Sequence, residues 1–297
     1  MKIKTKKTLY NFILSELEQL RENVKDNYDA NLETRKKNPF LVFKNSNAEK
    51  FMGLGRSIDS QLGNRIQNII YYLSRIRYGK ENVPNIVNIL CNKSSNKVTL
   101  ETFYIKGDIK KNNYYANTNP CKQIIFINEE INIYEAKRRM RIKKSVNISV
   151  KKNQIEYDHV AENIIDDILT LKPKKIPVDL LIISEKNDGI KTFEIKMSGN
   201  LDTKNAESNA REVERLYKLF SFTKDNASYF ATCYGECSDA VKTEVSKHLS
   251  KNSILNTEDF WDMILPVGDE EISKDDFIEL YSKAFIKSGI EKVVLAL

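Results

Sequence analysis

Three charged residues in the second half of the chain have the types and the order that phosphodiester hydrolysis needs. Asp179 comes first, and Glu194 and Lys196 follow after an intervening turn. Two carboxylates supply the hard oxygen ligands that Mg²⁺ prefers, and such an ion neutralises phosphate charge and polarises a water. A lysine held beside the ion would orient or help to deprotonate that water and offset charge in the transition state. The three residues therefore predict one metal-dependent site for phosphate esters.

The elements expected to carry these residues form a β-hairpin. β-Branched and other apolar residues dominate 177–184 and 190–197, which predicts two short strands. The residues between them read Glu-Lys-Asn-Asp-Gly, and Asn, Asp and Gly are the types that accept turn conformations. The second strand is therefore expected to fold back on the first.

The register of this hairpin should bring the three charges together. A turn centred near residue 187 places Asp179 beside residues 194 and 195 of the partner strand, within one residue. Because side chains alternate across a strand, Glu194 and Lys196 share one face while their neighbours point to the other. Asp179 and Glu194 are therefore predicted to share a cation.

Hydrophobic periodicity predicts an α/β fold around the hairpin. Residues 28–56, which contain Pro39 and two glycines, are interpreted as an irregular connection, and Gly79 is expected to end a helix. The predicted helices cover 9–24, 57–78, 158–171 and 203–221, with more helices after residue 234, and the other predicted strands cover 98–105, 123–127 and 227–234. We divide the chain into a basic helical region at 1–97 and a core with C-terminal helices at 98–297, with one continuous domain as the alternative.

The sequence around the three charged residues resembles that of a nuclease superfamily. Pro177-Val178-Asp179, followed after a hairpin by Glu194-Ile195-Lys196, resembles the PD-(D/E)XK signature. Residues 198–206, Ser-Gly-Asn-Leu-Asp-Thr-Lys-Asn-Ala, are similar to the segment after the catalytic lysine in type II restriction endonucleases of the TdeIII kind. Residues 56–63 are similar to the start of a helix near the front of many such enzymes.

The resemblance implies a fold, an activity, a cofactor and a partner. The expected fold is a PD-(D/E)XK nuclease core, in which helices flank a central mixed β-sheet. The expected activity is that of a type II deoxyribonuclease from a restriction-modification system, a homodimer that cuts double-stranded DNA at a short palindrome, of the GGNCC type in the TdeIII group. Asp179 and Glu194 would hold Mg²⁺, and Lys196 would complete the catalytic set.

One departure from the family pattern concerns an auxiliary acid. Relatives often carry a Glu four residues after the glycine of the first motif helix, and this chain has Gln67 there. Gln67 remains a catalytic candidate, although an amide binds Mg²⁺ more weakly than a carboxylate does. A third acidic ligand would then be Asp59, Glu162 or Asp166, or would be absent.

Charge is divided unequally along the chain, which carries a formal net charge of +7. Residues 1–150 hold 28 Lys and Arg against 14 Asp and Glu, whereas residues 151–297 hold 20 against 27. The basic half is suited to nucleic-acid phosphates, with a solvated basic surface as the alternative. The candidates for DNA contact are Arg138, Arg139, Arg141, Lys143 and Lys144 in the densest basic cluster, and Asn200 and Lys204 after the catalytic lysine. As the alternative to contacting DNA, Asp202 and Lys204 would hold the start of a helix, with Asp202 or Thr203 as its cap.

The composition argues against several other classes. The longest apolar stretches, such as 293–297, are far shorter than the roughly 20 residues that span a bilayer. The amino terminus offers no secretory cleavage site, so we expect a cytoplasmic protein with reduced thiols and no membrane partner. Cys233 and Cys237 lack a second Cys or His pair at zinc spacing, which favours structural thiols over a zinc site.

Two other functions remain open at this point. A structure-directed or repair nuclease would use the same active-site chemistry on a different DNA substrate. A DNA- or RNA-binding protein without catalysis would carry the acidic pair by chance. An RNA-recognition sheet would show aromatics at alternate strand positions, whereas Phe103 and Tyr104 are direct neighbours.

Overall fold

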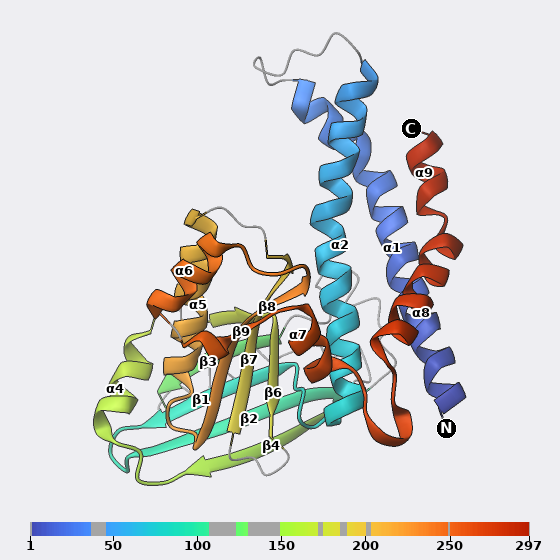
Figure 1. The fold of residues 1–297 in the computed structure, drawn as a ribbon. Helices are drawn as coiled ribbons and strands as arrows, with labels where there is room; N and C mark the ends of the chain where they lie inside the picture. Colours follow the sequence, from blue (N-terminus) through green and yellow to red (C-terminus); the bar gives the residue numbers. More distant parts are fainter. Residues whose placement is uncertain are drawn as a thin grey trace. The chain divides into compact units, whose positions relative to one another are not determined.

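The chain forms two compact units in the computed structural model shown in Figure 1. The helical unit consists of residues 1–73 and 265–297, and the sheet unit consists of residues 74–264. Residue 97, where the sequence suggested a boundary, begins a strand inside the sheet unit. The structure describes residues 2–36, 46–106, 123–129, 149–171, 175–184, 189–199, 203–248 and 250–296.

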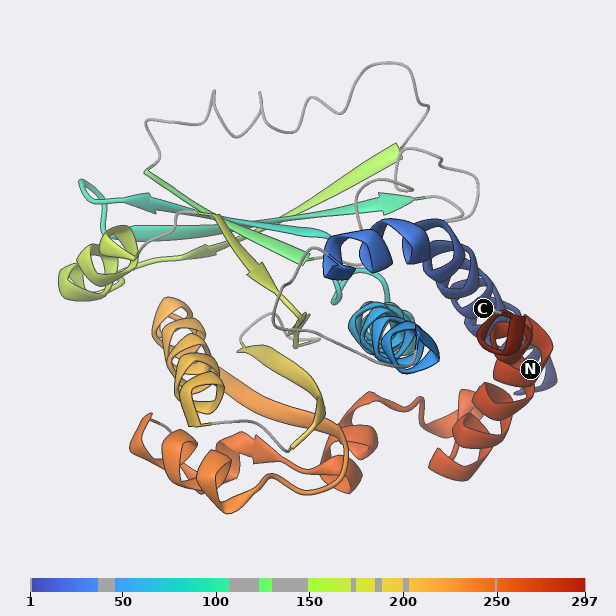
Figure 2. The same ribbon diagram turned by 90° about the horizontal axis from the view of Figure 1, so that it is seen from above.

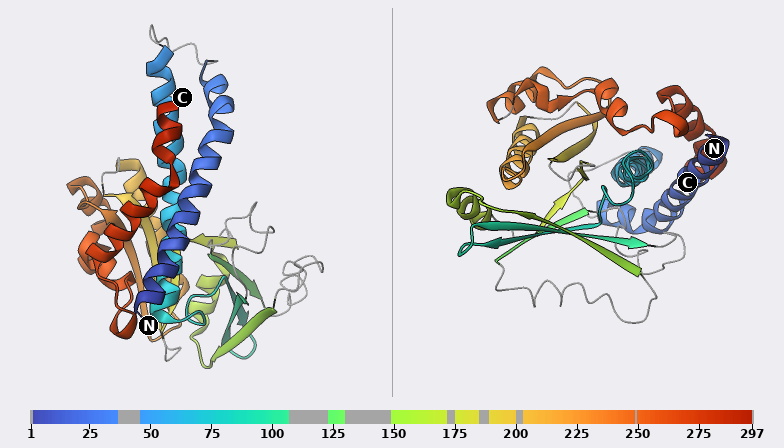
Figure 3. Two further views of the ribbon diagram at one scale, coloured as in Figure 1. Left: turned by 90° about the vertical axis from the view of Figure 1, so that its right-hand side faces the viewer. Right: turned by 90° about the horizontal axis from the view of Figure 1, so that it is seen from below.

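Helices make up most of the described part of the helical unit. They are α1 (Lys2–Lys36), the part of α2 (Ser46–Tyr78) up to residue 73, α8 (Lys274–Ser288) and α9 (Ile290–Ala296), with a short 3-10 helix, η5 (Gly268–Glu270). Within this unit α8 and α9 run beside α1 (Figure 3). The apolar stripe predicted on α1 is buried, and the ring of Phe12 stacks on that of Tyr72 with 4.2 Å between centroids. A capping box at Ser273 begins α8, and Gly289, with φ of 75°, ends it.

A buried carboxylate joins α1 to α2. Glu16 is 4% exposed, and its Oε2 accepts hydrogen bonds from Asn68 Nδ2 at 2.8 Å and Arg65 Nη1 at 3.2 Å. A buried charge is costly unless it is paired and hydrogen-bonded. This network therefore favours a single alignment of the two helices.

The prediction for residues 28–56 was wrong. The described parts of this range, 28–36 and 46–56, are helical and belong to α1 and α2. The first of them contains Ala, Leu, Glu, Arg and Lys, which have high helix propensity, and neither Gly nor Pro. The two glycines on α2 each cost about 1 kcal/mol in a helix interior, but tertiary packing can offset this, and Leu54 between them is buried.

Sheet A, one of two mixed sheets formed by the described strands of the sheet unit, has the order β4-β2-β1-β3-β5. Its strands are β1 (Ile86–Asn92), β2 (Lys97–Lys106), β3 (Gln123–Glu129), β4 (Ser149–Tyr157) and β5 (Lys175–Val178). β1 is parallel to β3, and the other neighbours are antiparallel. Sequence periodicity predicted β2 and β3 but not β1 or β4. The run Lys-Lys-Asn-Gln in β4, an edge strand, explains why β4 gave no apolar signal.

Sheet B has the order β6-β7-β8-β9 and contains the predicted hairpin. Its strands are β6 (Leu180–Ile183), β7 (Gly189–Ser198), β8 (Asp225–Tyr234) and β9 (Ile254–Leu255). β6 and β7 pair antiparallel, which confirms the hairpin. Helix α5 (Thr203–Leu219) then carries the chain over so that β8 lies parallel to β7, the usual connection between parallel strands.

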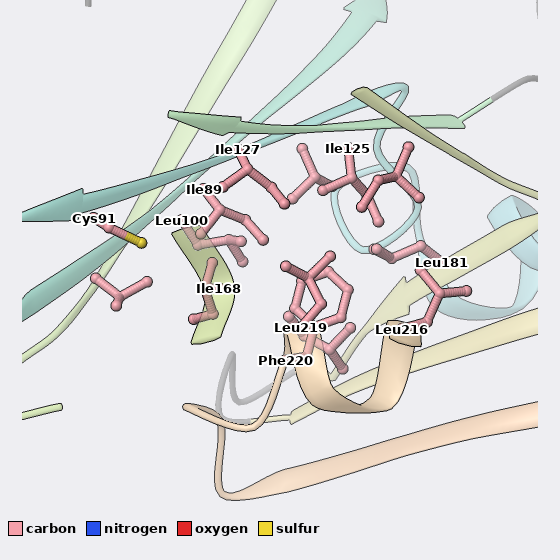
Figure 4. Close-up of a cluster of buried hydrophobic side chains, with 14 of the residues drawn as sticks. Ile89, Cys91, Leu100, Ile125, Ile127, Ile168, Leu181, Leu216, Leu219 and Phe220 are labelled. Atoms are coloured by element: carbon pink, nitrogen blue, oxygen red, sulfur yellow. The ribbon is translucent and has the colours of Figure 1, made fainter. Parts of the chain in front are cut away.

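Helix α5 contributes to two hydrophobic cores. Its last turn and α4 (Glu162–Thr170) pack on sheet A, and Figure 4 shows Ile168, Leu216, Leu219 and Phe220 facing Ile89, Ile125 and Ile127. Its other buried side chains, from Ala206 to Val213, pack with Phe230 of β8 and with α6 (Asp239–His248). The helix thus lies against both sheets, as Figure 2 shows. A short 3-10 helix, η4 (Lys251–Ser253), precedes β9, and α7 (Thr257–Ile264) follows it.

The fold class is α/β, as predicted, but the described strands form two mixed sheets flanked by helices, whereas the resemblance implied one central mixed sheet. The late aromatics Phe260, Trp261 and Phe277 are buried, whereas Tyr281 and Phe285 on α8 are half-buried. Among the described residues, no helix combines the length and the apolar character that a membrane span requires.

Candidate active site

The strand predicted at 177–184 is broken at Asp179. Before the break, β5 pairs with β3 in sheet A and ends with Val178 opposite Gln123. After it, β6 pairs with β7 in sheet B and begins with Leu180 opposite Phe193. The prediction of one continuous strand was therefore wrong, because the chain passes from one sheet to the other at the residue that carries the carboxylate.

The side chain of Gln123 fixes this crossing point. It is 1% exposed, and its Nε2 donates to the carbonyl of Pro84 at 2.6 Å and to that of Leu181 at 3.0 Å. Its Oε1 accepts from the amide of Leu181 at 2.7 Å. Breaking such a bond would leave a buried polar group unsatisfied, which is costly. The backbone just after Asp179 is therefore tied to sheet A.

The hairpin register agrees with the prediction. Leu180 pairs with Phe193, so the next position brings Asp179 beside Glu194. The backbone amide of Ile195 donates to Asp179 Oδ2 at 2.8 Å. The carboxylate of Asp179, which is half-buried, is thus held against the strand that carries the other two predicted residues.

Glu194 and Lys196 lie on one face of β7, as the alternation of side chains predicted. Lys196 Nζ donates to Glu194 Oε1 at 2.8 Å, and the two side chains are 28% and 13% exposed, respectively. Phe193, on the opposite face, is fully buried. The structure therefore brings Asp179, Glu194 and Lys196 together in a partly buried position.

The surroundings of Glu194 disfavour its negative charge. Burial, and then the nearby charge of Asp179, raise its pKa to about 7, although the Lys196 ammonium acts in the opposite direction. Two like charges held together in a partly desolvated position are a common arrangement at functional sites. A divalent cation between them would remove the repulsion.

A third carboxylate close to the pair comes from α5 and was not predicted. Glu212 is half-buried and forms an ion pair with Arg215 at 2.9 Å. Burial, with a further contribution from the charge of Asp179, raises the pKa of Glu212, and its charge in turn contributes to the raised pKa of Glu194. The crossover from β7 to β8 brings these groups together, and no spacing in the sequence indicates it.

The acids that the sequence suggested as third ligands have other surroundings. Asp166 forms an ion pair with Lys93 at 2.7 Å, and Glu162 is exposed in the first turn of α4. Asp59 is exposed on α2, in the helical unit. In the described ranges, no three Cys, His, Asp or Glu side chains converge as metal ligands, so the candidate metal position is the pair Asp179 and Glu194.

The segment after Lys196 packs closely against the loop after β8. A Cβ atom on Gly199 would lie 2.3 Å from the carbonyl oxygen of Glu236 and 2.6 Å from the amide nitrogen of Cys237. The amide of Ser238 donates to the carbonyl of Gly199 at 3.1 Å. Only glycine fits here, and the close approach joins the carboxyl ends of β7 and β8.

The other predicted site residues are not tested by this geometry. Gln67 lies half-buried on α2 in the helical unit, and Lys204 lies in the first turn of α5. The basic cluster and the remaining polar candidate fall outside the described residues, namely Arg138, Arg139, Arg141, Lys143, Lys144 and Asn200. Their catalytic or DNA-binding roles remain predictions.

Cys233 and Cys237 are buried free thiols. Burial raises the pKa of both, that of Cys233 to about 12. Because metal ligation and nucleophilic attack need the thiolate, these surroundings suit structural thiols.

Comparison with known proteins gives no family assignment. No family model matches the chain, and neither the curated proteins nor the solved structures include a match. The function is therefore inferred from the site itself.

Proposed function

We propose that the chain is a Mg²⁺-dependent deoxyribonuclease with its active site at Asp179, Glu194 and Lys196. The proposal is carried by the contact of Asp179 with the β7 backbone beside the Glu194–Lys196 ion pair. Two carboxylates and an amine meet there in a partly buried position. This is the combination that metal-assisted hydrolysis of a phosphodiester needs.

The donor set fits a divalent cation. Both carboxylates offer hard oxygen ligands, and the repulsion that raises the pKa of Glu194 is the kind that a bound cation relieves. When bound, Mg²⁺ would supply Lewis acidity toward a phosphate oxygen and lower the pKa of a coordinated water. Asp179 and Glu194 are the residues that would hold it.

Asp179, Glu194 and Lys196 would each have a separate role in the reaction. Asp179 is fixed by the Ile195 amide and lies next to the crossing point that Gln123 ties to sheet A, so its carboxylate keeps one position. The ion pair with Lys196 holds the carboxylate of Glu194 in position to bind a cation. The Lys196 ammonium lies beside Glu194, so it could hold the attacking water or donate to a phosphate oxygen when a substrate is bound.

Double-stranded DNA is the proposed substrate, cut at a short palindrome by a homodimer of the type II restriction kind. The resemblance of residues 177–179, 194–196 and 198–206 to TdeIII-type enzymes supports this proposal, as does the excess of Lys and Arg in residues 1–150. A two-fold symmetric dimer presents one active site to each strand of a palindrome. A GGNCC-like site is the first sequence to test.

Incubation of plasmid DNA with the protein and Mg²⁺ tests the proposal. We expect discrete fragments from the unmodified protein and from Asp166→Ala, whose acid lies in another ion pair, and none from Asp179→Ala. A smear that also depends on Asp179 would favour the structure-directed or repair nuclease. Binding without any cleavage by a folded, Mg²⁺-supplied protein would favour the non-catalytic DNA-binding protein.

A further inference from the structure

An exposed tyrosine lies at the end of the strand pair that carries the site. Tyr234 is 57% exposed, and among the large aromatic side chains of the described residues only Tyr217, at 48%, compares with it. In the parallel ladder, Ser198 pairs with Tyr234 and Lys196 pairs with Thr232. Paired and alternate residues share a face, so Tyr234 lies on the face of Lys196, two residues or about 7 Å further along.

The backbone around Tyr234 is held firmly. The carbonyl oxygen of Gly235 accepts from Thr232 Oγ1 and from Thr257 Oγ1, each at 3.0 Å. The carbonyl oxygen of the residue before Tyr234 accepts from Trp261 Nε1 at 2.9 Å. An aromatic side chain on a fixed backbone loses little conformational entropy when it binds, as in binding sites that use Tyr as a rigid anchor.

The charges nearby favour a neutral contact at this position. The proposed site beside it is acidic, and Lys242, at the start of α6, is paired with Glu236 at 3.4 Å. Tyr binds a nucleic-acid backbone without a charge, because its ring packs on sugar and its hydroxyl donates to a phosphate oxygen. Such a contact leaves the attraction of the carboxylates for a cation undisturbed.

We propose that Tyr234 binds the DNA strand within one or two nucleotides of the scissile phosphate, with its ring against a deoxyribose and its hydroxyl on the adjacent phosphate. This inference rests on the proposed function and names a substrate contact of the same site. The DNA strand to be cut then passes from the Glu194–Lys196 ion pair over Ser198 to Tyr234.

Tyr234→Ala and Tyr217→Ala form a matched pair for the test. Tyr217 lies on α5, and its carbonyl accepts from Asn226 at the opposite end of β8. Binding to a labelled, mixed-sequence DNA duplex is measured with Ca²⁺ in place of Mg²⁺, over a range of salt concentrations. We expect Tyr234→Ala to weaken binding about tenfold, Tyr234→Phe to weaken it less, and Tyr217→Ala to leave it unchanged.

The salt dependence separates this contact from a general loss of charge. Because the lost group is neutral, the slope of log K against log salt should stay the same in Tyr234→Ala. Unchanged binding, or a slope that falls with the affinity, would overturn the inference. Tyr234→Leu gives the same decision if thermal unfolding shows that the Ala variant is not folded. Failure of the proposed function is recognised separately, as the absence of Mg²⁺-dependent cleavage by the unmodified protein.

Discussion

The backbone amide of Ile195 donates to the carboxylate of Asp179 at 2.8 Å, at the point where the chain passes from one sheet to the other. The position of Asp179 therefore depends on the β7 backbone and not only on β5 and β6, between which it lies. An Asn at this position could still accept the hydrogen bond, so the charge can be removed while the geometry is retained.

Asp179→Asn and Lys196→Ala should each reduce Mg²⁺-supported cleavage by about three orders of magnitude or more. DNA binding should persist, because phosphate contacts elsewhere carry most of the affinity. Without metal, Asp179→Asn should even bind DNA more tightly, since one carboxylate no longer repels the phosphate. Cleavage time courses, with folding checked by thermal unfolding, measure this. An undiminished rate in either folded variant would place the active site elsewhere.

The hairpin and its charges were predictable because their signals are local. Alternation predicted that Glu194 and Lys196 share one face, and the Asn-Asp-Gly sequence predicted a register that brings Asp179 beside Glu194, which the pairing of β6 with β7 confirms. Both depend on the period of two in a strand and on turn chemistry, which a short stretch of sequence contains.

The rest of the site depends on contacts distant in sequence. The apolar run around Asp179 gives no sign that it divides between two sheets, because that break is set by pairing with β3 and by Gln123. Glu212 reaches the pair through the crossover helix, and its position follows from how α5 packs. Neither Gln123 nor Glu212 can be identified as part of the site from spacing in the sequence alone.

Gly199→Ala should destabilise the sheet unit by about 2 kcal/mol or more, because the added Cβ would meet backbone atoms that cannot move aside. Gly55→Ala on α2 is the matched control, since its added Cβ would meet no atom within 4 Å apart from its chain neighbours and the adjacent backbone of its own helix. That variant should be as stable as the unmodified protein or slightly more stable. Denaturant unfolding compares the two, and an equally stable Gly199→Ala would contradict the close approach.

Replacing Arg138, Arg139 and Arg141 together by Gln should weaken binding to DNA of any sequence and lower the salt slope by about three units. The control replaces Lys218, Lys247 and Lys283, each of which is ion-paired with a Glu on its own helix. Equal effects in both triple variants would show that net charge, and not the predicted basic cluster, governs binding.

Glu212→Gln should raise the Mg²⁺ concentration needed for half-maximal cleavage about tenfold. The change removes a negative charge near Asp179 and Glu194, together with the ion pair that Glu212 forms with Arg215, so the attraction of the site for Mg²⁺ weakens. Cleavage at saturating Mg²⁺ should change little. The assay is run at pH 8, where Glu194, with a pKa of about 7, is mostly ionised and protons compete little with Mg²⁺. The control is Glu214→Gln, two residues away on α5 and paired with Lys218, which should behave as the unmodified protein. If both variants need the same Mg²⁺ concentration for half-maximal cleavage, Glu212 does not have this role.

The raised pKa of Glu194 predicts that the metal-free protein loses stability as pH rises. The carboxyl has a pKa of about 7 when folded and about 4.5 in its ordinary state, so between these values the unfolded chain binds fewer protons than the folded one. The free energy of unfolding therefore falls through this window, by an amount on the order of 3 kcal/mol once the group is fully ionised. Below about pH 4.5 this effect of Glu194 is absent.

Glu194→Gln isolates this effect from the other groups that titrate. In EDTA the variant should unfold at the same temperature as the unmodified protein near pH 4.5 and at a higher temperature at pH 8, because the amide carries no charge to bury. Adding Mg²⁺ at pH 8 should stabilise the unmodified protein and not the variant, since the ion relieves the repulsion between Glu194 and Asp179. Parallel melting curves across the whole pH range would mean that Glu194 is ionised at no cost, and the electrostatic case for a cation at this pair would be lost.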